Sequence, residues 1–396
     1  MRVREVQLED FRNYPQLHVA CDARRVVLLG ENGQGKTNLL EAIYLGLTGS
    51  SFRTARDREM IRWGQSGYRV RLEVEREDGP AEVTIATQAH ADGGGASRRQ
   101  VRVNATAVAA RELRGFFSAV VFTPDTLFLI KGGPQERRQF LDELLSQASS
   151  YYRHHLQRYQ RVLAQRNHIL QQAAAAGAGR ARSQLLETFT DVFLESAARL
   201  WERRLWAVSH LAKAAAQAYQ QIAGSSEPFT LAYESEAVPA ATPVAEVENS
   251  QDWVTLRHWL ERRLEAVADL EWRRGMTLVG PQRDDLRVMS GRVDLRTFGS
   301  QGQQRSAVLA LKLAEVCFLE QQTGRWPVFL LDDVLSELDP DRRQRFLRTI
   351  PSPTQVWITT AEPELLRTLQ ADDPKGGLDD LVLRVTDGRM EFPRME

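Results

Sequence analysis

The sequence predicts an α/β fold that is interrupted by an inserted all-helical arm domain. Short apolar runs at 26–29 and 328–331 precede glycine or aspartate, as buried parallel strands do. Between 134 and 223 strand signals are absent, and Leu, Ala, Gln, Glu and Arg recur at helical spacing. The α/β pattern returns after Met276. We therefore expect three parts, at 1–122, 123–275 and 276–396.

The remaining elements follow in chain order. A glycine-rich turn follows 26–29 and leads into a helix through Leu39, Leu40 and Ile43. The alternating stretches 70–74 and 83–85, joined at Asp78-Gly79, predict an antiparallel hairpin, and 101–103 another strand. We expect the helical part to be interrupted at 173–183 and to loop out at 236–250 before a last helix through Trp259 and Leu264. A further apolar run at 356–358 indicates another strand.

Composition limits the classes of protein that remain. The chain has 396 residues, enough for more than one domain. Its 52 basic and 52 acidic residues cancel, so any surface for nucleic acid must be local. Two cysteines do not make a disulfide framework, and neither a signal peptide nor a run long enough to span a membrane is visible. We expect a cytoplasmic protein without a membrane partner.

One motif identifies a phosphate site. Residues 30–37 match G-x-x-x-x-G-K-[ST], and they follow an expected strand and open an expected helix. In such a loop, backbone N–H groups and the helix N-terminus cradle phosphates. Lysine contacts the β and γ phosphates, and the hydroxyl suits Mg²⁺. The alternative is an ordinary glycine-rich turn, which the strand and helix disfavour. The expected ATP-binding residues here are Gly30, Glu31, Asn32, Gly33, Gln34, Gly35, Lys36, Thr37 and Asn38.

A pair of aspartates ends a second apolar run. Asp332 is the expected ligand of Mg²⁺, together with Thr37, and Asp333 is expected to polarise the attacking water. Neighbouring residues of a strand point to opposite faces, so the two carboxylates should have different roles. The alternative is a solvated strand end without chemistry.

Two further segments establish a resemblance. Residues 298–305 (FGSQGQQR) open a helix, and 336–339 read SELD. With the motifs above, they resemble the signature and D-loop of ATP-binding-cassette (ABC) ATPases. Specifically, GENGQGKTNLLEAIYL, SFRT, KGGPQERRQFLDELL, LAQRNHIL, GPQRDDL, GSQGQQRSAVLALKLAE and LLDDVLSELD follow the order of the RecF family along nearly the whole chain.

This resemblance implies a P-loop ABC-type ATPase head with a helical arm, which dimerises around two ATP molecules. Ser300, Gly302 and Gln303 would then act in trans at the partner's Lys36, with Ser300 as a catalytic residue. Arg12 and Asn13 match positions near the nucleotide in related heads, although a simple β-turn is an equal alternative.

Departures from the wider ABC pattern qualify this inference. Asp333 stands where glutamate is usual, so we expect slow turnover. Thr359 and Thr360 stand where transporters have a switch histidine, and Gln282 stands where a histidine is expected. No glutamine can be assigned to a Q-loop from the sequence.

The candidate DNA surface lies in the helical part. Six arginines occur there among tyrosines and histidines, and such cations suit phosphate contacts. The alternative is a solvated helical face, because Glu136, Asp142 and Glu143 lie nearby. Five tryptophans in helical stretches, at 201, 206, 253, 259 and 272, are expected to pack in the core. The six arginines are Arg137, Arg138, Arg153, Arg158, Arg161 and Arg166.

The function that the resemblance implies is ATP-dependent DNA binding in recombinational repair, replication maintenance and the SOS response. ATP and Mg²⁺ would support a homodimer that binds duplex DNA or gap junctions and helps load a recombinase with RecR/RecO-type mediators. Its ATPase activity would be weak and stimulated by DNA. The alternatives are a nucleotide-gated scaffold that does not require hydrolysis and an ABC transporter ATPase subunit.

Overall fold

The computed structural model describes residues 1–88, 98–175, 184–224, 227–237, 253–366 and 380–391. The chain forms two compact units. The first unit contains Met1–Thr126, Gln221–Ala223 and Lys312–Glu396, and the second contains Leu127–Gln220 and Gly224–Leu311.

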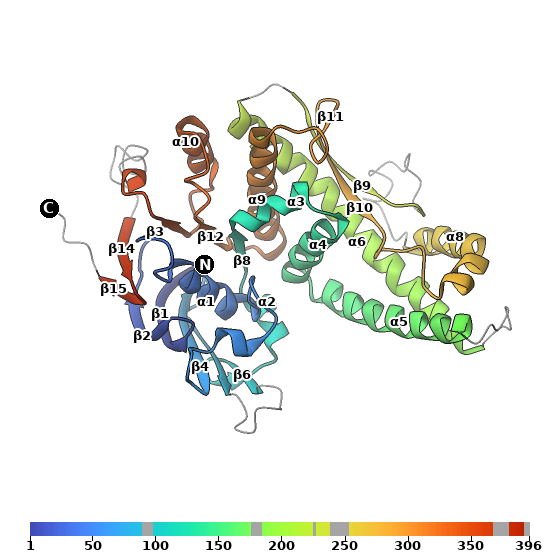
Figure 1. Ribbon diagram of the computed structural model, residues 1–396, viewed down its shortest axis with the longest axis horizontal. Helices are drawn as coiled ribbons and strands as arrows, with labels where there is room; N and C mark the ends of the chain where they lie inside the picture. The colour runs from blue at the N-terminus through green and yellow to red at the C-terminus, as the bar shows by residue number, and fades with distance from the viewer. Residues whose placement is uncertain (89–97, 176–183, 225–226, 238–252, 367–379, 392–396) are drawn as a thin grey trace. The chain divides into compact units, whose positions relative to one another are not determined.

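A six-stranded, mainly parallel sheet forms one layer of the first unit. Its order is β15-β14-β3-β13-β12-β8, and only the terminal β14–β15 hairpin is antiparallel. Strands from both ends of the colour scale therefore share this sheet (Figure 1). The strands expected at 26–29, 328–331 and 356–358 are confirmed. Their bounds are β3 Arg25–Leu29, β8 Ala119–Phe122, β12 Val328–Asp332, β13 Val356–Thr360, β14 Asp380–Thr386 and β15 Arg389–Glu391.

An antiparallel sheet forms the other layer of this unit, in the order β2-β1-β4-β5-β6-β7. The expected hairpin is confirmed as β4–β5, with Gly79 in its turn at φ 111°. The strand expected at 101–103 is part of β6, which pairs with β5. The strands are β1 Arg2–Phe11, β2 Tyr14–Ala20, β4 Gly67–Glu75, β5 Ala81–Gln88, β6 Arg98–Val103 and β7 Thr106–Ala107.

The helix α1 (Lys36–Thr48) joins the two sheets into one core. Its buried Leu39 and Ile43 share a cluster with Leu72 of the antiparallel sheet and with Leu330 and Trp357 of the parallel sheet. Burial of these side chains fixes the start of α1 against the end of β3. The unit also contains η1 Asp57–Met60, η2 Ala110–Glu112, α2 Leu113–Phe116 and α10 Pro340–Thr349.

The second unit is mainly helical, as expected, but it also contains a small sheet. β9 lies inside the part expected to be all-helical, and it pairs with β10 in the order β11-β10-β9. Alternation of the buried Phe229 and Leu231 with exposed residues explains this short strand. The expected interruptions at 173–183 and 236–250 lie largely outside the described residues. The elements are α3 Phe128–Lys131, α4 Pro134–Ala148, α5 Ser150–Ala175, α6 Gln184–Ala223, β9 Phe229–Glu234, α8 Trp253–Arg274, β10 Asp285–Ser290 and β11 Val293–Asp294.

Three elements contain residues of both units. The helix α9 (Gln301–Thr323) begins in the second unit and ends in the first, α6 has its last three residues, Gln221–Ala223, in the first unit, and η3 (Pro124–Leu127) has its last residue in the second. In the part of the chain that the structure describes, no helix combines the length and apolar character needed to cross a membrane.

Candidate nucleotide-binding site

The loop between β3 and α1 has the backbone of an anion site. Gly33 and Gly35 have φ values of 83° and 113°, which favour glycine strongly over residues with a side chain. Gly35 caps α1 without a side-chain hydrogen bond, and the first turn of the helix contains no acidic residue. The first N–H groups of α1 are therefore available to an anion such as a phosphate.

The side chain of Lys36 points back to the loop that precedes it. Its Nζ donates to the carbonyl oxygens of Gly30 at 2.6 Å and Glu31 at 2.9 Å, and only 6% of the residue is exposed. Burial lowers the pKa of the Lys36 ammonium, and the carboxylates of Asp333 and Asp332 oppose that shift. The ammonium is thus placed at the loop where phosphate oxygens would lie.

Two hairpin turns hold the outside of the loop. In the β1–β2 turn, Asn13 Nδ2 donates to the Gln34 carbonyl at 3.0 Å. In the β14–β15 turn, the Gly388 N–H donates to the same carbonyl at 3.1 Å, and the Asp387 N–H donates to Gln34 Oε1 at 2.6 Å. The backbone of the loop is therefore fixed by segments from far-apart parts of the sequence.

Thr37 and Asp332, the two expected ligands of Mg²⁺, lie side by side. Thr37 Oγ1 donates to Asp332 Oδ1 at 2.8 Å, and Thr359 Oγ1 donates to the same atom at 2.9 Å. Burial raises the pKa of Asp332, and the hydrogen bonds from the two threonines oppose this rise. Hydroxyl and carboxylate oxygens are hard donors that fit Mg²⁺, which takes few protein ligands when phosphates supply the others.

Asp333 differs from the expectation in its backbone. β12 ends at Asp332, and Asp333 follows in a left-handed conformation at φ 54°. Strand alternation therefore does not set its direction. Instead, the Asp333 N–H donates to Thr359 Oγ1 at 2.8 Å, and Ser336 Oγ donates to the Asp333 carbonyl at 2.9 Å.

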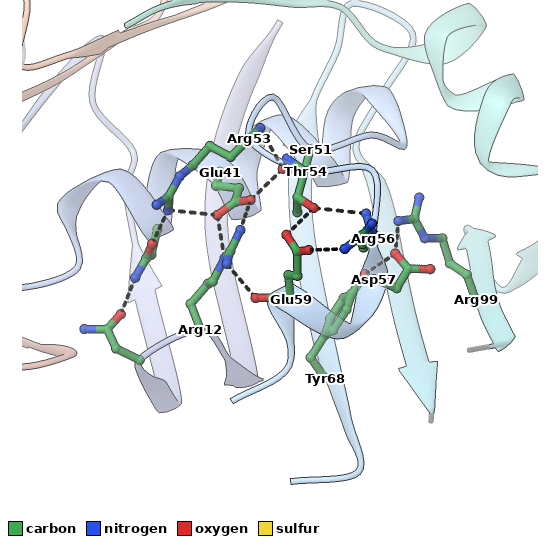
Figure 2. Close-up of polar contacts among 12 residues, drawn as sticks. Arg12, Glu41, Ser51, Arg53, Thr54, Arg56, Asp57, Glu59, Tyr68 and Arg99 are labelled. Carbon is green, nitrogen blue, oxygen red and sulfur yellow. Dashed lines mark hydrogen bonds and ion pairs between the residues drawn. The ribbon is translucent and has the colours of Figure 1, made fainter. Parts of the chain in front are cut away.

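Arg12 and Asn13 do form a tight turn between β1 and β2, and Asn13 also contacts the loop. Arg12 has a φ of 54°, and its guanidinium donates to both carboxylate oxygens of Glu41, at 2.8 and 2.7 Å. The Glu41 side chain is fully buried, and it also accepts from Ser51 and lies beside Arg53 (Figure 2). Arg12 is therefore held by a carboxylate of α1.

Two residues at this site were not assigned a role from the sequence. Thr359 reaches Asp332 because the two residues pair in the parallel strands β13 and β12. Arg53 donates to Asn38 Oδ1 at 2.7 Å, and its charge opposes the rise that burial causes in the pKa of Asp332. The only sequence signal for Arg53 is its position in the SFRT segment.

The signature residues lie at the start of α9, in the second unit. Ser300 and Gln303 form a capping box, in which the Ser300 N–H donates to Gln303 Oε1 at 2.9 Å and the Gln303 N–H donates to Ser300 Oγ at 3.2 Å. Ser300 is exposed and Gly302 partly so. Gln304 is different, because it is buried and donates to the Leu295 carbonyl at 2.7 Å.

Two of the six arginines of the expected DNA surface are buried, so for these two the expectation is wrong. Arg137 is buried and pairs with Asp285 at 2.6 Å, and Arg166 is buried and pairs with Glu271 at 2.5 Å. Arg138 donates to the Asp284 carbonyl at 2.7 Å. These cations stabilise the unit because their partners come close only in the fold. Arg153 and Arg158 also contact groups of this unit, Ser146 and Glu195, and Arg161 is exposed.

The GPQRDDL segment has a structural role in the same unit. Asp284 is buried and accepts from Trp201 and Tyr233, so Trp201 packs in the core as expected. Arg204 donates to the Pro281 carbonyl at 2.8 Å and to Asp142 at 2.8 Å. Gln282, found where a histidine was expected, accepts from Tyr159.

Comparisons with known proteins agree with this geometry. The model for the RecF/RecN/SMC N terminal domain matches residues 2–374. A solved structure described as the recombination mediator protein RecF with ATP, in the RecFOR pathway, superposes with a TM-score of 0.83 at 29% identity, covering 99% of this chain and 97% of that one. An Smc head bound to the C-winged helix domain of ScpA has a TM-score of 0.55 at 14% identity and supports the fold alone.

The chain thus has the α/β fold of the ATPase heads of the RecF/RecN/SMC class. The DNA replication and repair protein RecF of Symbiobacterium thermophilum is 40% identical over 377 residues, which cover 94% of this chain and 95% of that protein. RecF of Bacillus pumilus is 35% identical over 367 residues, covering 92% and 94%. Within its class, the chain belongs to the RecF family.

Proposed function

We propose that this protein is an ATP-dependent DNA-binding protein of recombinational repair and replication maintenance. The observation that carries the proposal is the hydrogen bond between Thr37 and Asp332 at the phosphate loop. It joins the two halves of a Mg²⁺-nucleotide site that lie far apart in sequence. ATP bound to the RecF protein of a solved relative supports the same ligand here.

Each residue has a role in the proposed reaction. Lys36 and the N–H groups of the loop bind the β and γ phosphates, and Thr37 and Asp332 hold Mg²⁺. The metal supplies positive charge to phosphate oxygens. Asp333 orients the attacking water, and its short side chain favours slow hydrolysis. We propose further that DNA stimulates this activity.

A homodimer completes the site in this proposal. Ser300, Gly302 and Gln303 would bind the γ-phosphate held by the partner's Lys36. Support comes from the exposed start of α9, whose capping box leaves the Ser300 side chain at the surface. A symmetric pair of such contacts would bury two nucleotides.

Mixed dimers test this arrangement. Lys36→Arg and Ser300→Arg subunits should each be inactive alone. An equal mixture should regain about a quarter of the wild-type ATPase rate, because half of the dimers are mixed and each has one intact site. Light scattering should show dimers only with ATP. If the mixture stays inactive although mixed dimers form, the shared sites are wrong.

DNA binding is tested separately. Affinity for duplex, single-stranded and gapped DNA should increase with ATP and decrease steeply with salt, because phosphate contacts release counterions. We propose that the complex at gaps works with RecR/RecO-type mediators in the cytoplasm to load a recombinase. Equal affinity with and without ATP would contradict ATP-dependent DNA binding.

A nucleotide-gated scaffold is the second candidate, and the departure at Asp333 favours it. In that case ATP binding alone would switch partners. Asp333→Asn separates the two, because it should keep ATP binding and stop turnover. Normal repair in cells that carry this variant would favour the scaffold.

A further inference from the structure

Trp63 is displayed to solvent by a turn that follows η1. Its side chain is 97% exposed. The turn is closed by the Gln65 N–H, which donates to the Arg62 carbonyl at 3.0 Å. Gly64 allows it with a φ of 82°, and nothing lies within 4 Å of the place where a Cβ would be. The indole therefore stands clear of the protein.

This turn is anchored on both sides. The Arg62 N–H donates to the Asp10 carbonyl at 2.8 Å, and the Arg12 N–H donates to the Met60 carbonyl at 2.8 Å. Ile61 forms a bridge with Phe11, and Met60 is buried. The exposed position of Trp63 is consequently a property of the fold.

A polar network fixes the segment that leads to the turn (Figure 2). Thr54 Oγ1 donates to Glu59 at 2.5 Å, and Arg99 pairs with Asp57 and donates to the Gly49 carbonyl at 2.6 Å. Arg12 also donates to the Glu59 carbonyl at 2.5 Å. Both carboxylates of the segment, Asp57 and Glu59, therefore already have partners within the protein.

The surroundings of Trp63 are basic. The segment 53–63 contains four arginines and two acidic residues. Of the latter, Asp57 is paired with Arg99 and Glu59 is shared by Thr54 and Arg56. Arg56 and Arg58 are exposed, and Arg62 lies only 3.6 Å from Asp10, a weak surface pair. The segment is locally positive although the chain is neutral.

These features fit a nucleic acid better than a protein. Protein interfaces need a contiguous apolar core, but within the described residues from 53 to 69 no second large apolar side chain is exposed. An exposed aromatic ring beside cations is instead the arrangement that stacks bases and contacts phosphates. Bases inside a duplex have covered faces, so we take the stacking partner to be an unpaired base.

We propose that Trp63 stacks on an unpaired base beside a duplex end, while Arg56, Arg58 and Arg62 contact the adjoining phosphates. This inference rests on the DNA-binding function proposed above and specifies the DNA feature that is recognised. Recognition of the gap is thereby assigned to the first unit, whereas the sequence predicts a DNA surface only in the helical part.

The experiment compares full-length wild type, Trp63→Ala and Trp63→Phe. Three fluorescent DNA probes are used with ATP: a gapped duplex, a continuous duplex of the same length and a single strand. Phe128→Ala removes another exposed aromatic ring and serves as control. Trp63→Ala should weaken binding to the gapped and single-stranded probes about tenfold, and Trp63→Phe should restore most of it. Continuous duplex binding, ATPase rate and melting temperature should stay unchanged.

A gapped duplex with 5-bromouracil in the single-stranded part provides a direct readout. Irradiation should crosslink it to Trp63, as mapped by mass spectrometry. No loss with Trp63→Ala, equal loss on continuous duplex, or loss only of binding to a protein mediator would each overturn the inference. If the wild-type protein binds none of the probes, the DNA-binding function proposed above is itself contradicted.

Discussion

Thr37 and Asp332 are hydrogen-bonded at 2.8 Å although 295 residues separate them in the sequence. The contact exists because β3 and β12 are both neighbours of β13 in one parallel sheet, which places their carboxyl ends at the same edge. A second hydroxyl, that of Thr359 on β13, donates to the same carboxylate oxygen of Asp332. Thr37, Asp332 and Thr359 thus come together because Asp332 and Thr359 lie on adjacent strands and Thr37 begins the helix that follows the third.

Loss of the Thr359 hydroxyl should weaken Mg²⁺-dependent nucleotide binding. Thr359→Val removes the donor to Asp332 and the acceptor of the Asp333 N–H. Partners behind a metal ligand typically contribute 10- to 100-fold, so we expect about a tenfold higher Kd for MgATP. Thr360→Val is the matched control, since Thr360 Oγ1 accepts from Glu362 N–H away from Asp332. Titration calorimetry measures both, and equal affinities would contradict the role of Thr359.

Substitution of Gly388 should impair ATP binding through the phosphate loop. A Cβ there would lie 2.5 Å from the Asn13 carbonyl oxygen, so the turn must move away from Gln34. Gly324→Ala is the control, because its φ of 68° imposes similar strain with nothing within 4 Å. The positive φ should cost both variants about 1 kcal/mol of stability, and the contact with Asn13 should add to this loss in Gly388→Ala. Only Gly388→Ala should also raise the Kd for ATP, and parallel behaviour of the two would refute the coupling.

Removal of the Glu41 charge should destabilise the first unit strongly. Glu41→Gln leaves the guanidinium of Arg12 without its buried carboxylate, and such changes cost about 3–5 kcal/mol. Glu9→Gln breaks the exposed pair with Arg69 and should cost less than about 1 kcal/mol. Denaturant unfolding gives both free energies of unfolding. Similar small losses would mean that Arg12 finds other partners at little cost.

Neutralisation of Asp332 should stabilise the fold in the absence of nucleotide and metal. Burial raises the pKa of this carboxyl above its ordinary value, so the folded state holds the proton more tightly than the unfolded state. The contribution of Asp332 to the free energy of unfolding is therefore fully present at low pH and is lost as the pH rises through the folded-state pKa. Asp332→Asn should unfold at a higher temperature than wild type at pH 7, with the difference shrinking in acid. A lower melting temperature at pH 7 would show that the hydrogen bonds to the carboxylate outweigh its burial.

The elements that could be predicted from the sequence are those with strong local patterns. Residues 328–331 form an apolar run because both faces of the parallel sheet are covered, and the loop at 30–37 has glycines where positive φ values occur. β9 was missed because its alternation is short and borders a helical stretch. Asp333 was misinterpreted because strand alternation does not apply beyond the strand end.

Long-range pairing could not be predicted. The sequence around Arg137 and Arg166 shows cations on helices, and their partners Asp285 and Glu271 lie more than a hundred residues later. Whether an arginine faces solvent or a buried carboxylate depends on the tertiary fold. For the same reason, the sequence did not distinguish Trp63, which is exposed, from Trp201, which is buried.

The position of β3 has a consequence for synthesis on the ribosome. Its two sheet neighbours, β13 and β14, are encoded at residues 356–360 and 380–386. β3 therefore remains unpaired within that sheet while the residues between it and β13 are synthesised. Such late, non-local closure is slow and exposes apolar strands in the meantime. Nascent chains should consequently acquire ATP binding only at the end of translation, and a chaperone that shields residues 25–29 would raise the yield of active protein.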